Sequence, residues 1–119
     1  VPFYCTASGK MYLSTLNQAH LERYLSAARF EPHTPATLTD VGRLRAEIAA
    51  TRARGFAEDA EEFMDGMVAI AVPVRDDRGR MLSSLSFHAP TMRLGLEEAR
   101  RHAPRLHGTA EELSRLVLN

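Results

Sequence analysis

The chain has 119 residues, 45% of them hydrophobic and 25% charged, which is the composition of one ordinary globular domain. Fifteen basic and fifteen acidic residues cancel, so the chain is not expected to hold DNA or RNA itself, which usually takes a basic face. One cysteine excludes an intramolecular disulfide, and no apolar run approaches the roughly 20 residues of a membrane helix, so we expect a cytoplasmic protein without a membrane partner.

The first residues predict a strand that leads through a turn of small residues into a helix. Residues 2–5 are apolar, residues 6–10 read TASGK, and a helical pattern begins at Met11. Backbone N–H groups at such a helix start can bind a carboxylate or phosphate, whereas Thr6 or Ser8 can simply cap the helix. The two roles can coexist. Because the chain opens inside this strand, we expect part of the domain to precede residue 1.

Two more helices are predicted before the middle of the chain. Residues 17–28 carry leucines at helical spacing, and residues 30–37 form a loop with two prolines. An amphipathic helix follows over residues 40–54, with Thr39 as its cap and Gly55 as its stop. Its arginines indicate a solvated helix face rather than a nucleic-acid patch.

A short strand over residues 56–59 precedes an acidic loop, residues 60–65. The spacing of the carboxylates in this loop matches no calcium-binding loop. Asp59 differs from them, because it ends a strand that we expect to pair near the following hairpin. Its side chain could therefore point inward.

A β-hairpin is predicted from residues 67–74 and 81–87, joined by the turn Asp76-Asp77-Arg78-Gly79. Since strand side chains alternate, Ser84, Ser86 and His88 share one face of the second strand. Hydroxyls and an imidazole are not needed for a core, so this face is a candidate binding surface. Residues 89–91 should break the strand, and helices are expected over residues 94–102 and 104–118.

Eight features occur in one order along the chain: TASGK, TPATLTD, TRARGF, EDAEE, the spaced Gly66, AIAVPVRDDRG, SLSFHAP and EELSRLV. In this order the chain, over essentially all of residues 1–119, resembles the effector-binding domain of IclR-type bacterial transcription regulators. The resemblance implies an α+β, GAF-like fold in which helices flank a curved antiparallel sheet. It also implies a winged helix-turn-helix DNA-binding domain, absent from this chain, and missing first elements of the effector domain before residue 1.

The resemblance further implies an effector, a small organic acid or aromatic carboxylate, held between the sheet and the TASGK segment. Backbone N–H groups of Ala7 and Ser8 would hold its carboxylate. Asp59 matches a polar pocket position, and Ala69 matches a pocket wall whose small side chain leaves room for a bulkier acid. No cofactor and no metal are expected.

Ser86 and His88 match paired hydroxyl positions on the second hairpin strand of the family. His88 stands where many relatives carry serine, and its larger imidazole can carry charge. This difference favours a hydroxylated or aromatic acid over the smallest family ligands. Alternatively, His88 bonds Asp59 or a backbone carbonyl and does not meet the ligand.

The function expected from these residues is effector sensing that controls DNA binding through the missing domain, in a homodimer or homotetramer. We expect no enzymatic activity. One alternative is a small hydrolase using Ser86, His88 and Asp59 as a triad. Another is a metal-dependent sensor using Cys5, Asp59 and His88.

Overall fold

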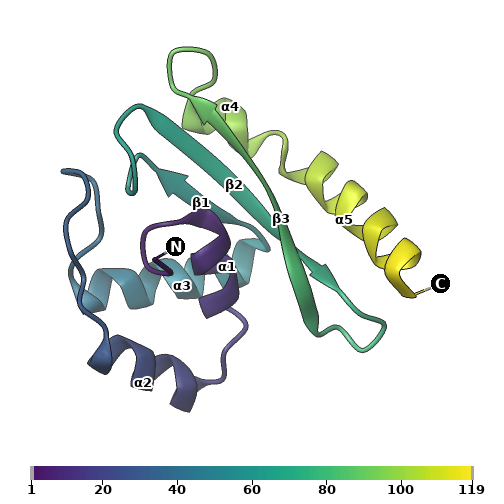
Figure 1. The fold of residues 1–119 in the computed structure, drawn as a ribbon, viewed down its shortest axis with the longest axis horizontal. Coiled ribbons are helices and arrows are strands. Elements are labelled where there is room, and N and C mark those ends of the chain that lie inside the picture. Colours follow the sequence, from purple (N-terminus) through teal and green to yellow (C-terminus); the bar gives the residue numbers. More distant parts are fainter. Residues whose placement is uncertain (1, 119) are drawn as a thin grey trace.

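The computed structural model describes residues 2–118. Its elements are, in chain order, α1 (Ala7–Leu13), α2 (Gln18–Ala27), α3 (Val41–Arg54), β1 (Ala57–Ala60), β2 (Met67–Arg75), β3 (Met81–Pro90), α4 (Leu96–Arg100) and α5 (Ala103–Leu118). The α+β class and the antiparallel sheet flanked by helices are confirmed (Figure 1).

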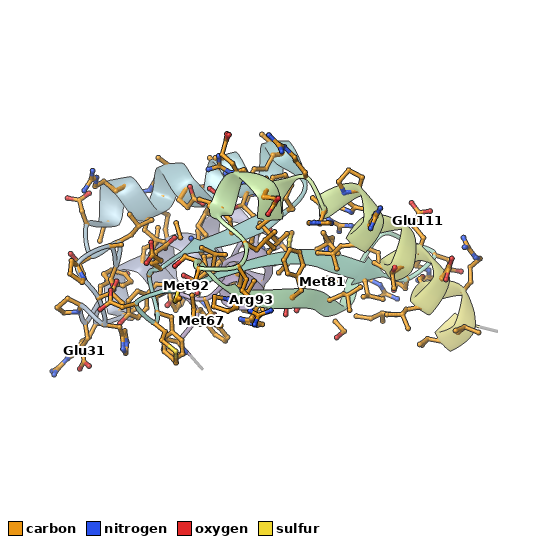
Figure 2. All side chains as sticks on the ribbon, turned by 90° about the horizontal axis from the view of Figure 1, so that it is seen from above. Glu31, Met67, Met81, Met92, Arg93 and Glu111 are labelled. Carbon is orange, nitrogen blue, oxygen red and sulfur yellow. The ribbon has the colours of Figure 1, made fainter. Side chains whose placement is uncertain are left out.

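The sheet is antiparallel in the order β1-β2-β3, so the apolar strand β2 is central. The turn after β2 is closed by Asp76, whose carboxylate accepts hydrogen bonds from the amides of Arg78 and Arg80. Met67 at the start of β2 and Met92 just beyond β3 lie at one end of the hairpin, and Met81 lies towards the other (Figure 2). The predicted hairpin is therefore confirmed.

The two faces of the sheet are covered by different helices. On one face, Ala7 and Met11 of α1 pack against Ala69 and Ala71 of β2. On the other face, α4 and α5 cover the alternate residues of β2, and these two helices run along one side of the sheet in Figure 1. Because the period of a strand is two, the α1 face of β2 has one apolar cluster and the opposite face has two.

The predicted strand at residues 2–5 is wrong, because this segment pairs with no strand of the described chain. Two of its apolar side chains, Tyr4 and Cys5, are instead buried in a cluster of helices, where they pack against α2 and α3. The Pro2 carbonyl accepts a hydrogen bond from the Thr6 hydroxyl, 2.8 Å away. Side-chain burial, rather than a backbone ladder, therefore holds the segment.

Several boundaries differ from the sequence prediction by a few residues. Helix α1 begins at Ala7 rather than Met11, so most of TASGK is helix and Thr6 is its cap. Asp40, not Thr39, caps α3 by accepting a hydrogen bond from the amide of Arg43. Strand β1 is shifted one residue along, and β3 continues through the expected break to Pro90. Helix α4 is shorter than the predicted helix.

Candidate functional site

Five of the six predicted site residues lie on the α1 side of the sheet. The register aligns Asp59, Ala69 and His88 across β1, β2 and β3, and places Ser86 opposite Ala71 two residues away. Alternation then puts these side chains on one face, and Ala7 of α1 packs against Ala69 there. The structure therefore brings Ala7, Asp59, Ala69, Ser86 and His88 together, and we call this surface the site face.

Helix α1 packs on the site face, and within the described residues its first two backbone amides donate no hydrogen bond. The Thr6 hydroxyl accepts a hydrogen bond from the amide of Gly9 at 3.1 Å, and the Thr6 carbonyl accepts one from the amide of Lys10 at 2.9 Å. Among residues 2–118, no hydrogen bond is made by the amides of Ala7 and Ser8. Of the two caps that the sequence allowed, Thr6 and Ser8, Thr6 is the one present. Within the described residues it leaves the Ala7 and Ser8 amides free.

Ser8 is half-buried beside a cavity of about 320 Å³ that lies between α1 and the beginning of β3. The residues that line this cavity are Phe3, Ser8, Gly9, Tyr12, Met81, Ser83 and Ser84. Its size is within the range of small-molecule sites. None of the other predicted site residues lines it, but Ser84, which does, lies on β3 two residues from Ser86.

Asp59 points inward, as its place in the strand allowed, and only 5% of it is exposed. Its carboxylate accepts a hydrogen bond of 2.7 Å from the amide of Glu62. Burial raises the pKa of Asp59, and the amides of Glu62 and Phe63 with the charge of Lys10 only partly offset that rise. Asp59 thus closes the turn after β1 and adds a carboxylate to the site face.

His88 is exposed at the far edge of the site face. Within the described chain, no hydrogen bond joins the imidazole of His88 to Asp59 or to a backbone carbonyl. The alternative in which this imidazole is satisfied by the protein is therefore not supported. Its ring remains available to a ligand on that face.

Neither alternative site is assembled in the described part of the chain. Asp59, His88 and Ser86 share a face, but no hydrogen bonds connect them as a triad requires. No group of three or more His, Cys, Asp or Glu residues within 2–118 could hold a metal ion. Burial, with the nearby carboxylates of Asp59 and Glu62, raises the pKa of Cys5 to about 11, which makes it a poor thiolate ligand.

Sequence reasoning missed Lys10, a residue of α1 whose side chain is fully buried. Its ammonium group lies 2.8 and 2.9 Å from the two carboxylate oxygens of Glu62 and 3.7 Å from Glu47. A lysine is almost never fully buried unless it is paired. The partner lies 52 residues away in the chain, so no local signal could have identified it.

No helix in residues 2–118 has the length and apolar character needed to cross a membrane.

Comparison with known proteins gives one consistent answer. The family model described as "Bacterial transcriptional regulator IclR C-terminal" matches residues 1–115. Among curated proteins, the chain is 34% identical over 113 residues to the "Probable transcriptional regulator SauR" of Cupriavidus necator. This match covers 95% of the chain and 45% of SauR. The chain spans less than half the length of this relative.

Solved structures give the same answer for the fold. The Thermotoga maritima IclR structure matches with a TM-score of 0.87 and 33% identity over 97% of the chain and 47% of that protein. The inducer-binding domain of PobR from Acinetobacter, a double mutant in complex with 3-hydroxybenzoic acid, matches with a TM-score of 0.92 and 29% identity. That match covers 98% of the chain and 67% of the PobR domain.

Proposed function

Because the chain belongs to the IclR family of bacterial transcriptional regulators and matches its C-terminal domain, we propose that it senses a small organic or aromatic acid. Binding would shift the protein between conformations that differ in their grip on DNA. The DNA contacts would be made by a winged helix-turn-helix domain outside this chain. The protein would act in the cytoplasm as a dimer or tetramer.

The observation that carries the proposal is the site face beneath α1. It combines small apolar side chains, such as Ala69 of β2, with a hydroxyl and an imidazole from β3 and a buried carboxylate from β1. Small-molecule sites have this composition, in which a few polar groups converge on an apolar floor. The PobR domain, which shares the fold at a TM-score of 0.92, is in complex with 3-hydroxybenzoic acid.

Each residue has a role that follows from its chemistry. The amides of Ala7 and Ser8 donate hydrogen bonds to the carboxylate of the acid, and the imidazole of His88 on β3 offers a further hydrogen-bonding group. Ser86 and Asp59 offer an oxygen each to a hydroxyl group on the ligand. Ala69 leaves space for a ring. The proposed effector class is therefore a hydroxylated or aromatic acid.

The test is a thermal-shift screen of the chain with benzoate, 3-hydroxybenzoate, pyruvate and glycolate. An acid at 100 times its Kd should stabilise the fold by about 2.7 kcal/mol. We expect the aromatic acids to raise the Tm more than pyruvate does. His88→Ala should weaken the response, whereas His20→Ala, an exposed residue on α2, should leave it unchanged.

Two results would contradict the proposal at different levels. If pyruvate raises the Tm and the aromatic acids do not, the effector class is wrong. If no acid in a wider panel raises it, and none co-purifies with the protein by mass spectrometry, acid sensing by this domain is wrong.

A further inference from the structure

A buried ion pair fastens α1 to the loop between β1 and β2. Lys10 is 0% exposed and Glu62 is 5% exposed. The ammonium group of Lys10 donates to both carboxylate oxygens of Glu62, at 2.8 and 2.9 Å. The second carboxylate near Lys10, that of Glu47, is 3.7 Å away and is itself bound to Arg54 at 2.7 Å.

The two ends of this pair each belong to a part of the site. Lys10 lies on the same short helix as Ala7 and Ser8, one turn further along. Glu62 follows Asp59 by three residues, and its amide donates to the Asp59 carboxylate. Its own carboxylate also accepts a hydrogen bond from the amide of Ala60 at 3.0 Å. A movement of Glu62 would therefore change the position of the Asp59 carboxylate.

The outer side of the same loop is fixed as well. The hydroxyl of Thr34 donates to the carbonyl of Glu61, and that of Thr37 donates to the carbonyl of Glu62. The loop is thus held between the segment that carries these two threonines and helix α1. The Lys10–Glu62 pair is its connection to α1.

Stability alone is a weak reason for such a pair. The free energy needed to remove an ammonium and a carboxylate from water offsets much of the attraction between them. Replacing a buried ion pair by apolar residues is therefore often neutral or stabilising. Buried ionic groups can instead fix one arrangement of the elements that they join. Here the elements are the helix and the loop on either side of the site face.

We propose that Lys10 and Glu62 are positioning residues of the effector site, which set the distance between the α1 amides and the Asp59 carboxylate. This inference rests on the proposed acid-sensing function. Neither residue needs to touch the effector. The pair acts by holding α1 and the loop in the one arrangement that binds the acid.

The test compares two double variants. Lys10→Met with Glu62→Gln removes the buried pair and keeps an acceptor for the Ala60 amide. The matched control is Arg100→Met with Glu58→Gln. It removes another bidentate ion pair, in which the Arg100 guanidinium donates to the two Glu58 carboxylate oxygens at 2.7 and 2.9 Å. Glu58 is 8% exposed and alternates with Asp59, so its pair lies on the opposite face of the sheet.

Titration calorimetry with 3-hydroxybenzoate, below the Tm of both variants, gives the first readout. We expect the Lys10 and Glu62 variant to bind at least tenfold more weakly than the wild type, and the control within twofold of it. Equal Kd values in the two variants would overturn the proposal. If the double variant does not fold, Glu62→Gln alone replaces it, with Glu58→Gln as its control and at least a threefold weakening expected.

Backbone hydrogen exchange without any ligand gives the second readout. We expect amides of residues 59–66 and of α1 to exchange at least tenfold faster in the Lys10 and Glu62 variant, relative to amides of β2, and to be unchanged in the control. Unchanged protection in both variants would overturn the proposal even if no acid binds. Failure of the wild type to bind any acid, with the exchange result as expected, would instead count against acid sensing alone.

Discussion

Replacing Gly9 by alanine should destabilise the fold, because α1 crosses the preceding segment at this residue. A Cβ at Gly9 would lie 2.4 Å from the Cα and 2.6 Å from the carbonyl oxygen of Phe3, and 2.6 Å from the Thr6 hydroxyl oxygen. Carbon atoms prefer about 3.5–4.0 Å, so the overlap with Phe3 exceeds about 1 Å. Two of the three atoms are main chain and cannot rotate away.

The expected size follows from two opposing effects. Overpacking of this kind costs about 1–3 kcal/mol, and the contact at Gly9 lies at the upper end because the backbone itself must move. Alanine favours a helix over glycine by about 1 kcal/mol. We therefore expect Gly9→Ala to lower the free energy of unfolding by about 2 kcal/mol, which corresponds to a Tm about 8 °C lower.

Gly108 provides the matched control, since it also lies in a helix but a Cβ there would meet nothing within 4 Å. Gly108→Ala should therefore stabilise the chain by up to about 1 kcal/mol. The two variants are compared by urea unfolding and by thermal melting. If Gly9→Ala proves as stable as the wild type, the close packing of α1 on Phe3 is not what the structure indicates.

The remaining predictions concern the cap, the buried thiol and one ion pair. Thr6→Ala should cost about 1 kcal/mol, measured by urea unfolding, because the Gly9 amide loses its acceptor; Thr6→Ser should restore most of this, and no loss in Thr6→Ala would argue against the cap. Cys5 is fully buried, and burial raises its pKa to about 11, so a thiol reagent at pH 8 should label it only as fast as the chain unfolds; rapid labelling of the folded chain would contradict its burial. Burial acts to raise the pKa of Glu58, but the hydrogen bonds from Arg100 and nearby positive charges outweigh it and lower the pKa below 4.5. The stability contributed by the ionised Glu58 is therefore present above about pH 4.5 and lost as the pH falls through the lower folded value. Urea unfolding between pH 3 and 7 should show a smaller loss on acidification in Arg100→Ala than in the wild type, and parallel curves would show that Arg100 does not set the pKa of Glu58.

The parts of the fold that the sequence predicts well are those determined by neighbouring residues. The hairpin follows from two apolar runs around Asp76 to Gly79, and α3 from its apolar stripe and from Gly55, which takes a left-handed conformation at φ 84°. The inward direction of Asp59 follows from alternation once its strand pairs with β2. Such patterns need no knowledge of the tertiary structure.

What the sequence does not reveal depends on contacts between distant segments. Residues 2–5 have a strand-like pattern, yet Tyr4 and Cys5 are buried by helices, and no strand of the described residues pairs with them. Lys10 looks like a surface residue until Glu62 is placed beside it. The face of β3 on which His88 lies was predicted from alternation. Its exposure was not, because exposure depends on which distant segments pack against β3.

The two walls of the site lie far apart in the chain, and this has a consequence for folding. The hairpin of β2 and β3 can close through local contacts, whereas α1 reaches its place only when contacts more than 40 residues apart form, such as that between Lys10 and Glu62. Closing a longer loop costs more chain entropy and delays such contacts. Docking of α1 should therefore be a late step in folding and an early one to reverse. A ligand held between α1 and the sheet would slow that reversal, so its presence should be visible as a slower rate of unfolding.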